Sequence, residues 1–380
     1  MKKVVLLIVG MVLTLVGYWG WRESQRVQTP LVSQTTTKTD TLSQDKVETK
    51  KTSSGLNQPL PDTKSLFITY WGIGGFDEKV FDYDRLIYFG VAIDQNGVQR
   101  QTDGYRHLKQ FVGLASDSQE KYLTVTMTDN EANLALLDQA ESVQQRIWSD
   151  VVNVAQDNGF QGVVLDLELS QTLSREKTVL LTDRFVSDFA RQIRSAGLHA
   201  AVVLPGDLFY RHRPYDLAGI AKVTDEIMIM AYDFHKSRGE PGPNFPLAGK
   251  ATYGYDMQTM ISDYRRAVPQ GKITVVFGMF GYDWTVDEKK RPIKEAESLT
   301  LKQITTQFID QCRWQDCVVR RDDLARETEV DYVYSQVKDD YGLMDFHIVW
   351  FDDDQSVQDK ISWLRRQGIN RFVYWAWGYF

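Results

Sequence analysis

From residue 65 onward, short runs of apolar residues alternate with stretches in which apolar residues recur every three or four positions. The first pattern is typical of strands buried on both faces, and the second of amphipathic helices. Eight apolar runs occur, at residues 65–71, 85–93, 122–127, 162–169, 199–204, 226–232, 272–279 and 371–377. The helical pattern is clearest at 143–159 and 183–197, and Gly197 follows the second stripe as a helix-terminating glycine does.

Eight strands alternating with helices over residues 65–380 predict a (β/α)8 barrel, which is an α/β fold. The alternative is a doubly wound open sheet, but no GxGxxG follows the first strand to support dinucleotide binding. The spacing of the runs is broken once, because residues 285–345 form a long charged insertion between strands seven and eight. We expect this insertion to be a subdomain or a large loop.

A separate apolar segment precedes the alternating pattern. Residues 4–21 carry no charge and, as a helix, would span about 27 Å, close to the hydrocarbon thickness of a bilayer. The aromatic-rich residues 18–21 stand where a cleaved signal peptide would have its small-residue cleavage site, and they resemble an interfacial belt. We therefore predict an uncleaved single-pass anchor at residues 1–21, rather than a cleaved signal. Lys2 and Lys3 would stay in the cytoplasm and the rest of the chain would lie outside.

Residues 22–64 are rich in Ser, Thr, Gln and Lys and have no apolar period, which predicts a disordered linker. The formal charge is +4 for residues 1–64 and −11 for residues 65–380. An acidic body argues against a nucleic-acid partner. The two cysteines, Cys312 and Cys317, would form a small disulfide loop in an exported protein or stay as thiols in a reducing compartment. With no histidine nearby, they lack the ligands for zinc.

Strand four carries an unusual pair of residues. Side chains alternate along a strand, so Asp166 and Glu168 share one face with Gly162 and Val164, while the other face is entirely apolar. The apolar face should pack against the outer helices, which turns the acids toward the barrel axis at the end where barrel enzymes build their sites. A carboxyl group kept protonated by its neighbour can donate its proton to a leaving oxygen. The alternative is a pair of acids held in salt bridges inside the barrel.

This stretch resembles the DGxDxDxE signature that family 18 glycoside hydrolases carry on strand four. MAYDFH, at residues 230–235, resembles that family's strand-six M-x-Y-D, and Trp375 in FVYWAWG matches the tryptophan beneath its sugar subsite. The resemblance covers residues 65–380 and is greatest to the spore-germination and cortex-type branch, which acts on peptidoglycan N-acetylglucosaminyl bonds. EPGPNFPLAG, MFGYDW and VWFDDDQS resemble motifs of that branch. Many members carry a small α+β subdomain where this chain has its insertion.

The resemblance implies a role for each matching residue. Glu168 would be the general acid and later the general base. Asp166 would orient and stabilise the substrate's acetamido group while its carbonyl oxygen attacks the anomeric carbon, in a substrate-assisted retaining reaction. The Tyr232 hydroxyl would hydrogen-bond the same acetamido oxygen, Asp233 would contact the sugar, and Trp375 would lie beneath it. This mechanism needs a 2-acetamido sugar and implies no metal or organic cofactor.

Two positions depart from the family pattern. Gln161 and Val164 stand where the family has aspartates. Gln161 begins the strand, far from any sugar. Val164 matters more, because the family's aspartate there shares a proton with the residue that matches Asp166. The site is therefore either a hydrolase that tolerates the valine or a lectin-like site, and we favour the hydrolase because Glu168 is retained.

Further substrate-binding candidates stand at the C-terminal ends of predicted strands. Met230 shares a strand face with Tyr232, and Tyr70 and Trp71 close strand one. Less specific candidates are Phe89, Trp284, Trp377, Asp207 and His235. The acidic residues 352–354 would suit a cation, but a solvated helix cap before QSVQDKI explains them better.

The sequence leaves three classes of function open. The first is a membrane-anchored hydrolase of N-acetylglucosaminyl bonds that works outside the cytoplasm, and this is our prediction. The second is a non-catalytic glycan-binding protein, and the third is a barrel that helps to assemble an envelope complex. We expect peptidoglycan as the substrate in preference to chitin, because a tethered, outward-facing domain lies within reach of a cell wall. We also expect a monomer.

Overall fold

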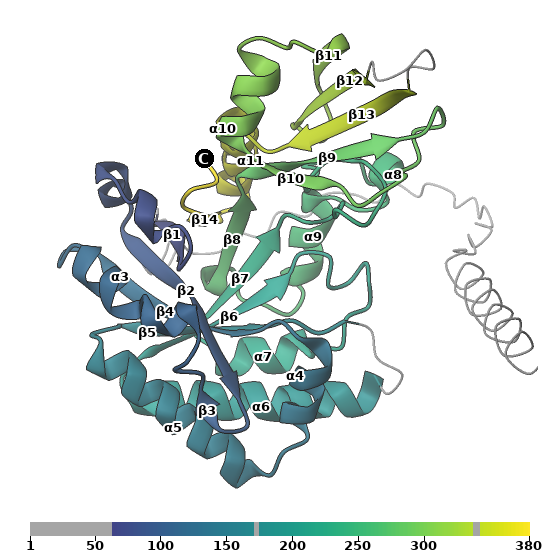
Figure 1. Cartoon of the computed structure of the whole chain (residues 1–380). Coiled ribbons are helices and arrows are strands. Elements are labelled where there is room, and N and C mark those ends of the chain that lie inside the picture. The colour runs from purple at the N-terminus through teal and green to yellow at the C-terminus, as the bar shows by residue number, and fades with distance from the viewer. Residues whose placement is uncertain (1–62, 171–174, 337–342) are drawn as a thin grey trace, which may run out of the picture. The chain divides into compact units, whose positions relative to one another are not determined.

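The computed structural model describes residues 63–170, 175–336 and 343–380 of the 380-residue chain. In these ranges eight parallel strands form a closed barrel, because β1 pairs with both β2 and β14 (Figure 1). The strands are β1 (Thr63–Thr69), β2 (Arg85–Asp94), β4 (Glu120–Met127), β5 (Gly162–Leu167), β6 (His199–Pro205), β7 (Glu226–Ala231), β8 (Ile273–Gly278) and β14 (Arg371–Trp375). Each predicted apolar run contains or overlaps one of them. The closure confirms the barrel and excludes the open doubly wound sheet.

The barrel starts slightly earlier than predicted. Thr63 and Lys64 belong to β1 rather than to the linker, because they pair with Arg371 and Phe372 of β14. The predicted anchor at residues 1–21 and the rest of the predicted linker lie outside the described residues. Within the described ranges, no helix is both long enough and apolar enough to cross a membrane.

The longer helices lie outside the barrel and bury one apolar face. In α5 this face consists of Ile147, Trp148, Val151 and Val154, at helical spacing. Aspartate side chains accept a backbone N–H at the start of several helices, which satisfies donors that the helix itself leaves free. The helices are α2 (Asp103–Arg106), α3 (Leu108–Leu114), α4 (Asn130–Leu137), α5 (Glu141–Asp157), α6 (Arg175–Ser195), α7 (Leu217–Val223), α8 (Lys250–Tyr253), α9 (Met257–Tyr264) and α11 (Asp354–Arg366). Short 3-10 turns occur at Ile73–Gly75, Glu78–Asp82 and Gln270–Lys272, and the short strand β3 (Gly97–Val98) pairs with the end of β2.

The barrel interior is a packed apolar core below the C-terminal ends of the strands. It is built from side chains that alternate inward along every strand: Phe67, Ile87, Tyr122, Val164, Ala201, Val203, Met228, Val276 and Val373. At the opposite end, Arg85 donates two hydrogen bonds to Glu226, at 2.7 and 2.9 Å. Any pocket on the barrel axis must therefore lie above this core, at the C-terminal ends of the strands.

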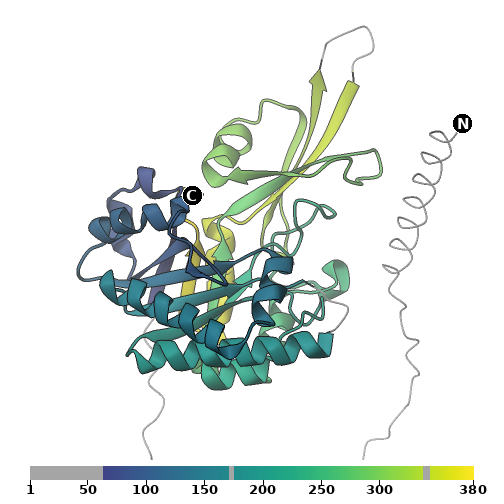
Figure 2. The same ribbon diagram turned by 60° about the horizontal axis from the view of Figure 1, so that its bottom comes forward.

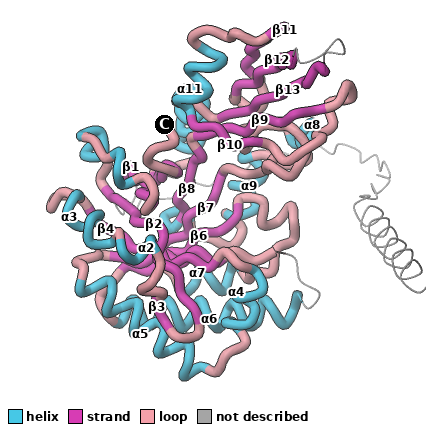
Figure 3. The backbone as a smooth tube through the Cα atoms, in the orientation of Figure 1, coloured by secondary structure: helices cyan, strands magenta, loops and turns pink. Residues whose placement is uncertain are grey.

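The insertion between β8 and β14 forms a subdomain with a five-stranded antiparallel sheet, ordered β10-β9-β13-β12-β11. It projects from the barrel beyond β7 and β8 (Figures 2 and 3). Its elements are β9 (Phe280–Val286), β10 (Glu297–Thr300), α10 (Leu301–Ile304), the π-helical turn η4 (Thr305–Ile309), β11 (Gln315–Arg321), β12 (Thr328–Gln336) and β13 (Leu343–Phe351). The sheet extends beyond the predicted bounds 285–345 on both sides. Only Met279 separates the end of β8 from the start of β9, and β13 runs to Phe351.

Cys312 and Cys317 are joined by a disulfide bond that closes the short loop leading into β11. Of the two alternatives left by the sequence, the structure therefore has the disulfide loop. The loop contains Trp314, which packs against Tyr332 and Tyr334 of β12. The disulfide thus fixes one corner of the insertion sheet.

Candidate active site

A pocket of about 260 Å³ opens at the C-terminal end of the barrel, directly above the apolar core. Asp166, the last inward-facing residue of β5, lies at its floor, and Glu168 follows immediately after the strand. Asp166 is 5% exposed, whereas Glu168 presents its side chain to the pocket. The two carboxyl groups therefore share one small cavity, as the alternation along the strand predicts.

Hydrogen bonds from three neighbouring segments fix the end of β5. The Glu168 N–H donates to the Met127 carbonyl of β4 at 2.9 Å, and the Asn133 amide donates to the Glu168 carbonyl at 2.8 Å. The Tyr215 hydroxyl donates to the Leu167 carbonyl at 2.6 Å. Because the backbone on each side of Glu168 is held, the direction of its side chain is set by the fold.

Strand β7 and the residues after it supply one wall, through Met230, Tyr232 and Asp233. Tyr232 lies tight against β8: a Cβ atom on Gly278 would be 2.6 Å from the Tyr232 Cβ, so only glycine fits there. Asp233 has a left-handed backbone, with φ of +58°, a conformation that aspartate adopts more readily than most residues. Its N–H donates to the Asn244 side chain at 2.8 Å.

Aromatic side chains form the opposite wall around Trp375, the last residue of β14. The Trp375 ring is nearly parallel to that of Tyr232, with centroids 6.2 Å apart, and makes edge contacts with Phe67 and Phe89. Aromatic faces of this kind offer a flat apolar surface on which the apolar face of a sugar ring can stack. The pocket therefore has an aromatic platform beside its acids.

The insertion contributes directly to the pocket through Phe280, Tyr282 and Ser298. The Tyr282 hydroxyl donates to an Asp233 carboxylate oxygen at 2.8 Å. Two cations also line the cavity. Arg213 is held by Asp207 through contacts of 2.6 and 3.1 Å, and Lys236 follows Asp233 on the same loop.

Asp166 is unusual in its hydrogen bonding. Its Oδ1 is buried and has no hydrogen-bond partner among the described residues, because Val164 below it is apolar. Burial, and then the charge of Glu168, raise the pKa of Asp166 to about 8. This carboxyl group therefore loses its proton at a higher pH than a free aspartic acid does.

Glu168 also has a raised pKa, since the pocket walls remove water from around it; Lys236 and Arg213 partly oppose this rise. Burial likewise raises the pKa of Asp233 and places that of the Tyr232 hydroxyl well above its usual range. The pocket thus holds acids that can keep a proton near neutral pH and a phenol that stays a hydrogen-bond donor.

A family model described as "Glycosyl hydrolases family 18" matches residues 14–379. This chain belongs to that family. The match spans almost the whole chain and confirms the resemblance read from strands four, six and eight. Membership places the chain among glycoside hydrolases.

Individual relatives are distant. The cortical fragment-lytic enzyme of Bacillus anthracis is 22% identical over 244 residues, covering 62% of this chain and 51% of that protein. Chitotriosidase-1 of Mus musculus is 21% identical over 258 residues, covering 62% and 53%. The crystal structure of the Bacillus cereus spore cortex-lytic enzyme SleL superimposes with a TM-score of 0.65 at 17% identity, covering 85% of this chain and 72% of that one. The chain spans about half the length of the curated relatives it matches, and the structural likeness confirms the barrel fold.

Six of the eight predicted site residues line this pocket: Asp166, Glu168, Met230, Tyr232, Asp233 and Trp375. Tyr70 and Trp71 do not line it. Both lie in the turn after β1 and not on the inward face of that strand. Trp71 is 50% exposed and packs edge-on against Phe89, which does line the pocket, whereas Tyr70 packs beside the outer core. Their contact with substrate stays a prediction, and it would require a glycan that extends beyond the pocket.

Of the less specific candidates, two line the pocket and three do not. Asp207 and Phe89 line the pocket, Trp284 lies on β9 of the insertion sheet and is fully buried, and His235 contacts the Pro243 carbonyl at 2.7 Å. Trp377 is buried and does not line the pocket. Sequence reasoning missed Arg213, Lys236, Tyr282, Ser298, Tyr379 and Phe67. Lys236 could have been found from its place on the loop that carries Asp233, but nothing in the sequence marks Ser298.

The acidic residues 352–354 do not form one solvated cap, which corrects that prediction. Asp353 does cap α11, accepting the Ser356 N–H at 2.8 Å. Asp352 is instead fully buried and paired with Lys360, because it lies between the end of β13 and the packed face of α11. Among the described residues there is no group of three or more His, Cys, Asp or Glu side chains arranged to hold a metal ion.

Replacing Asp166 with asparagine should stabilise the protein above pH 4. An acid with a raised folded-state pKa binds a proton on folding between about pH 4 and pH 8, so stability falls as pH rises through that window. Asparagine does not titrate and avoids this loss, which amounts to at most about 4 kcal/mol at pH 7. Urea unfolding followed by tryptophan fluorescence at pH 4, 6 and 8 should show a gain that grows with pH. A gain independent of pH would mean that Asp166 is ionised in the folded protein.

Replacing Lys236 with glutamine should move the alkaline limb of the pH–rate profile to higher pH. Lys236 lowers the pKa of Glu168, so its loss lets that pKa rise further, and a general acid works only while protonated. Lys236→Arg keeps the charge and is the matched control, with an unchanged limb. The alkaline limb of each variant is measured from kcat/KM between pH 5 and 10. An equal shift of that limb in the two variants would reject an electrostatic role for Lys236.

Proposed function

We propose that this chain is a glycoside hydrolase that cleaves the bond on the anomeric side of an N-acetylglucosamine residue. The observation that carries the proposal is the pair Asp166 and Glu168, both with raised pKa values, in a pocket that also holds Tyr232 and Trp375. An acid, an acetamide-binding group and an aromatic platform are what a substrate-assisted retaining reaction requires. Residues 166 and 168 match the family motif at the positions that carry this chemistry.

In the first step, the acetamido carbonyl oxygen of the sugar attacks its own anomeric carbon. The bond to the leaving oxygen breaks, and Glu168 transfers its proton to that oxygen. The product is a cyclic oxazolinium ion, with the positive charge spread over the former amide. Asp166 accepts the acetamide N–H, and the Tyr232 hydroxyl donates to the acetamide oxygen, so the two hold the nucleophile in place.

In the second step, Glu168 is a carboxylate and acts as general base. It removes a proton from a water molecule, which attacks the anomeric carbon and reopens the ring, so the configuration is retained. Asp166 stabilises the positive ion most when it is itself ionised. Because its pKa is about 8, activity should depend more on pH than in a site where a second aspartate shares its proton.

The second candidate function is glycan binding without turnover, and one observation favours it. The Asp166 Oδ1 has no partner among the described residues, and Val164 cannot share the Asp166 proton as an aspartate at position 164 would. A site in which Asp166 stays protonated could hold an N-acetyl sugar and still stabilise the ion poorly. We favour the hydrolase because Glu168 is present and open to the pocket.

We propose peptidoglycan as the substrate and the outer side of the cell membrane as the place of action. The disulfide between Cys312 and Cys317 supports an oxidising compartment. The apolar segment 4–21 supports a membrane anchor, and the match to a cortical fragment-lytic enzyme supports a cell-wall glycan. The alternative substrate is chitin, in line with the match to a chitotriosidase. We also propose that the protein acts as a monomer.

The test incubates the full-length protein, in a mild detergent, with N-acetylglucosamine oligomers and with purified peptidoglycan. Products are identified by mass spectrometry between pH 4 and 9. Fragments that end in a reducing N-acetylglucosamine are expected from both, with faster release from peptidoglycan. Binding without products would establish the glycan-binding alternative, and neither binding nor products would reject both.

A further inference from the structure

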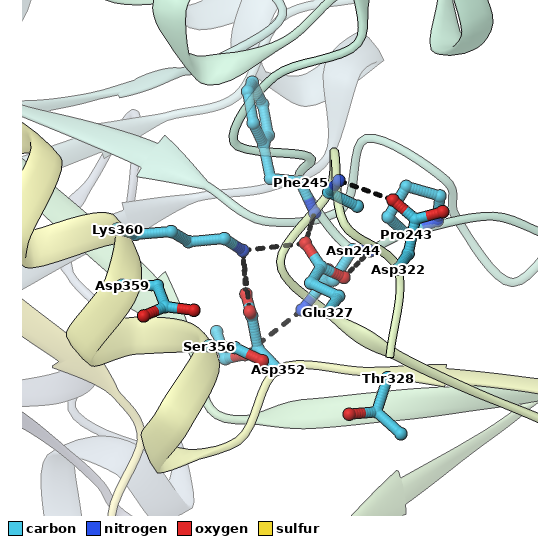
Figure 4. Close-up of polar contacts among 12 residues, drawn as sticks. Pro243, Asn244, Phe245, Asp322, Glu327, Thr328, Asp352, Ser356, Asp359 and Lys360 are labelled. Atoms are coloured by element: carbon cyan, nitrogen blue, oxygen red, sulfur yellow. Dashed lines mark hydrogen bonds and ion pairs between the residues drawn. The ribbon is translucent and has the colours of Figure 1, made fainter. Parts of the chain in front are cut away.

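A buried ionic cluster lies where the insertion meets the barrel, outside the pocket. Lys360 of α11 contacts Glu327 at 2.7 Å and Asp352 at 2.6 and 2.7 Å, and all three side chains are fully buried (Figure 4). Glu327 immediately precedes β12 of the insertion, and Asp352 follows β13. Burial lowers the pKa of Lys360, but the two carboxylates outweigh that effect and raise it. The lysine is therefore a fixed cation inside the protein.

Glu327 uses its remaining hydrogen-bonding capacity on the loop that follows β7. Its two carboxylate oxygens accept the backbone N–H groups of Asn244 and Phe245, at 2.5 and 2.8 Å. Figure 4 shows the carboxylate between this loop and the Lys360 side chain. A single side chain of the insertion thus satisfies two consecutive buried donors of the barrel.

The Asn244 side chain continues the connection to the pocket. Its Oδ1 accepts the Asp233 N–H at 2.8 Å, and its Nδ2 donates to the Gly278 carbonyl at 3.1 Å. The backbone of Asn244 also accepts the N–H of Phe234 at 2.8 Å. Asp233 needs such support, because a left-handed backbone costs a non-glycine residue about 1–2 kcal/mol. The hydrogen bond from its N–H to Asn244 supports the backbone of Asp233, while the Tyr282 hydroxyl holds its carboxylate.

We propose that Glu327 is a positioning residue of the pocket, through which the insertion fixes Asp233 and its neighbour Tyr232. The connection runs from Lys360 to Glu327, then to the backbone at Asn244 and Phe245, and from the Asn244 side chain to Asp233. The effect of this connection on kcat and KM rests on the function proposed above. The insertion therefore contributes to the site in two ways. Tyr282 forms part of the pocket wall, and Glu327 holds the loop behind that wall.

Stability alone does not account for this cluster. Well-packed apolar side chains often replace buried ion pairs with no loss of stability, because removing charges from water is costly. An apolar residue at position 327, however, would leave the N–H groups of Asn244 and Phe245 without the acceptors they now have. A carboxylate is needed there to hold the loop, and the lysine is needed to hold the carboxylate.

The test compares Glu327→Gln, Asn244→Ala and the double variant with the parent, as full-length proteins. The matched control is Glu329→Gln, two residues further along the chain in β12, where the side chain pairs with the half-exposed Arg320 at 3.1 Å. kcat and KM are measured on an N-acetylglucosamine tetramer well below the midpoint of thermal unfolding. Hydrogen exchange of residues 230–246 is measured in parallel, without substrate.

We expect each single variant to lower kcat/KM about 10–100-fold, since small misplacements of a site have effects of that size. The double variant should be no worse than Asn244→Ala alone, because Glu327 acts through Asn244. The amides of Asp233, Asn244 and Phe245 should exchange at least about ten times faster in Glu327→Gln. The control should match the parent in both measurements.

Additive losses in the double variant, or unchanged kinetics in folded Glu327→Gln, would overturn the proposal. Unchanged exchange at residues 230–246 would overturn it as well. The exchange measurement needs no turnover, so it decides the positioning role even if the parent cleaves no glycan. In that case the function proposed above fails, while the role of Glu327 is still settled.

Discussion

Replacing Glu168 with glutamine should lower kcat by about 10²–10⁴-fold, the usual contribution of a general acid–base group. The amide keeps the size of the side chain and its place in the pocket, but it can neither give a proton to the leaving oxygen nor take one from water. Glu168 is also the residue whose backbone is held on both sides, so the change should not disturb β5. Binding of an N-acetylglucosamine tetramer, measured by calorimetry, should persist.

The matched control is Glu120→Gln, at the start of β4 and therefore at the opposite end of the barrel. It should retain the parent's kcat. If Glu168→Gln also retained the parent's kcat, Glu168 would not be the general acid. The proton donor would then have to be sought among the other pocket acids, Asp166, Asp207 and Asp233.

Replacing Lys360 with methionine should destabilise the protein by about 3–5 kcal/mol at pH 7, because it leaves buried carboxylates without their counter-ion. Glu327 and Asp352 would face each other in a site with no exposure to water. Burial, and then Glu327, already raise the pKa of Asp352. Without the lysine, Asp352 would take up a proton on folding more readily, so the loss should be smaller at pH 5 than at pH 7.

Urea unfolding at the two pH values measures this effect. Lys109→Met is the matched control, since Lys109 is exposed on α3, and its change should stay within about 0.5 kcal/mol. A Lys360→Met protein as stable as the parent at pH 7 would show that the buried carboxylates do not need the lysine as a counter-ion.

The barrel could be predicted from sequence because its strands are buried on both faces and so appear as continuous apolar runs. β5 shows this well, since all six of its residues are buried. The acid pair of the site could be predicted for a related reason, whereas Tyr232, Asp233 and Trp375 were predicted from the family resemblance. Alternation along one strand places Asp166 and Glu168 on one side, and a parallel barrel brings the ends of β5, β7 and β14 to a common mouth.

The insertion itself could be predicted, but its contribution to the pocket could not be predicted in this way. Tyr282 and Ser298 reach the pocket only because β9 and β10 pair in one register, and neither residue is marked by its sequence neighbours as a pocket residue. The burial of Asp352 could not be predicted from the sequence either. An acid next to a helix start suggests a cap, and only the packing of β13 against α11 shows that it is buried beside Lys360.

Val164 is the clearest departure from the family pattern, and its physical meaning comes from the packing. It belongs to the apolar barrel interior, so the atom above it, Asp166 Oδ1, is buried without a partner among the described residues. The proposed reaction must therefore proceed with an Asp166 whose pKa is about 8. A rate that depends strongly on pH is the corresponding expectation.

The most direct test of the central claim follows the anomeric protons of the product by NMR during the first minutes of reaction. The full-length protein is given an N-acetylglucosamine tetramer and, separately, the matching tetramer without acetyl groups. A retaining reaction assisted by the acetamido group predicts that the β-anomer appears first and that the second tetramer is not cleaved. Initial release of the α-anomer, or cleavage of both tetramers at similar rates, would contradict the account.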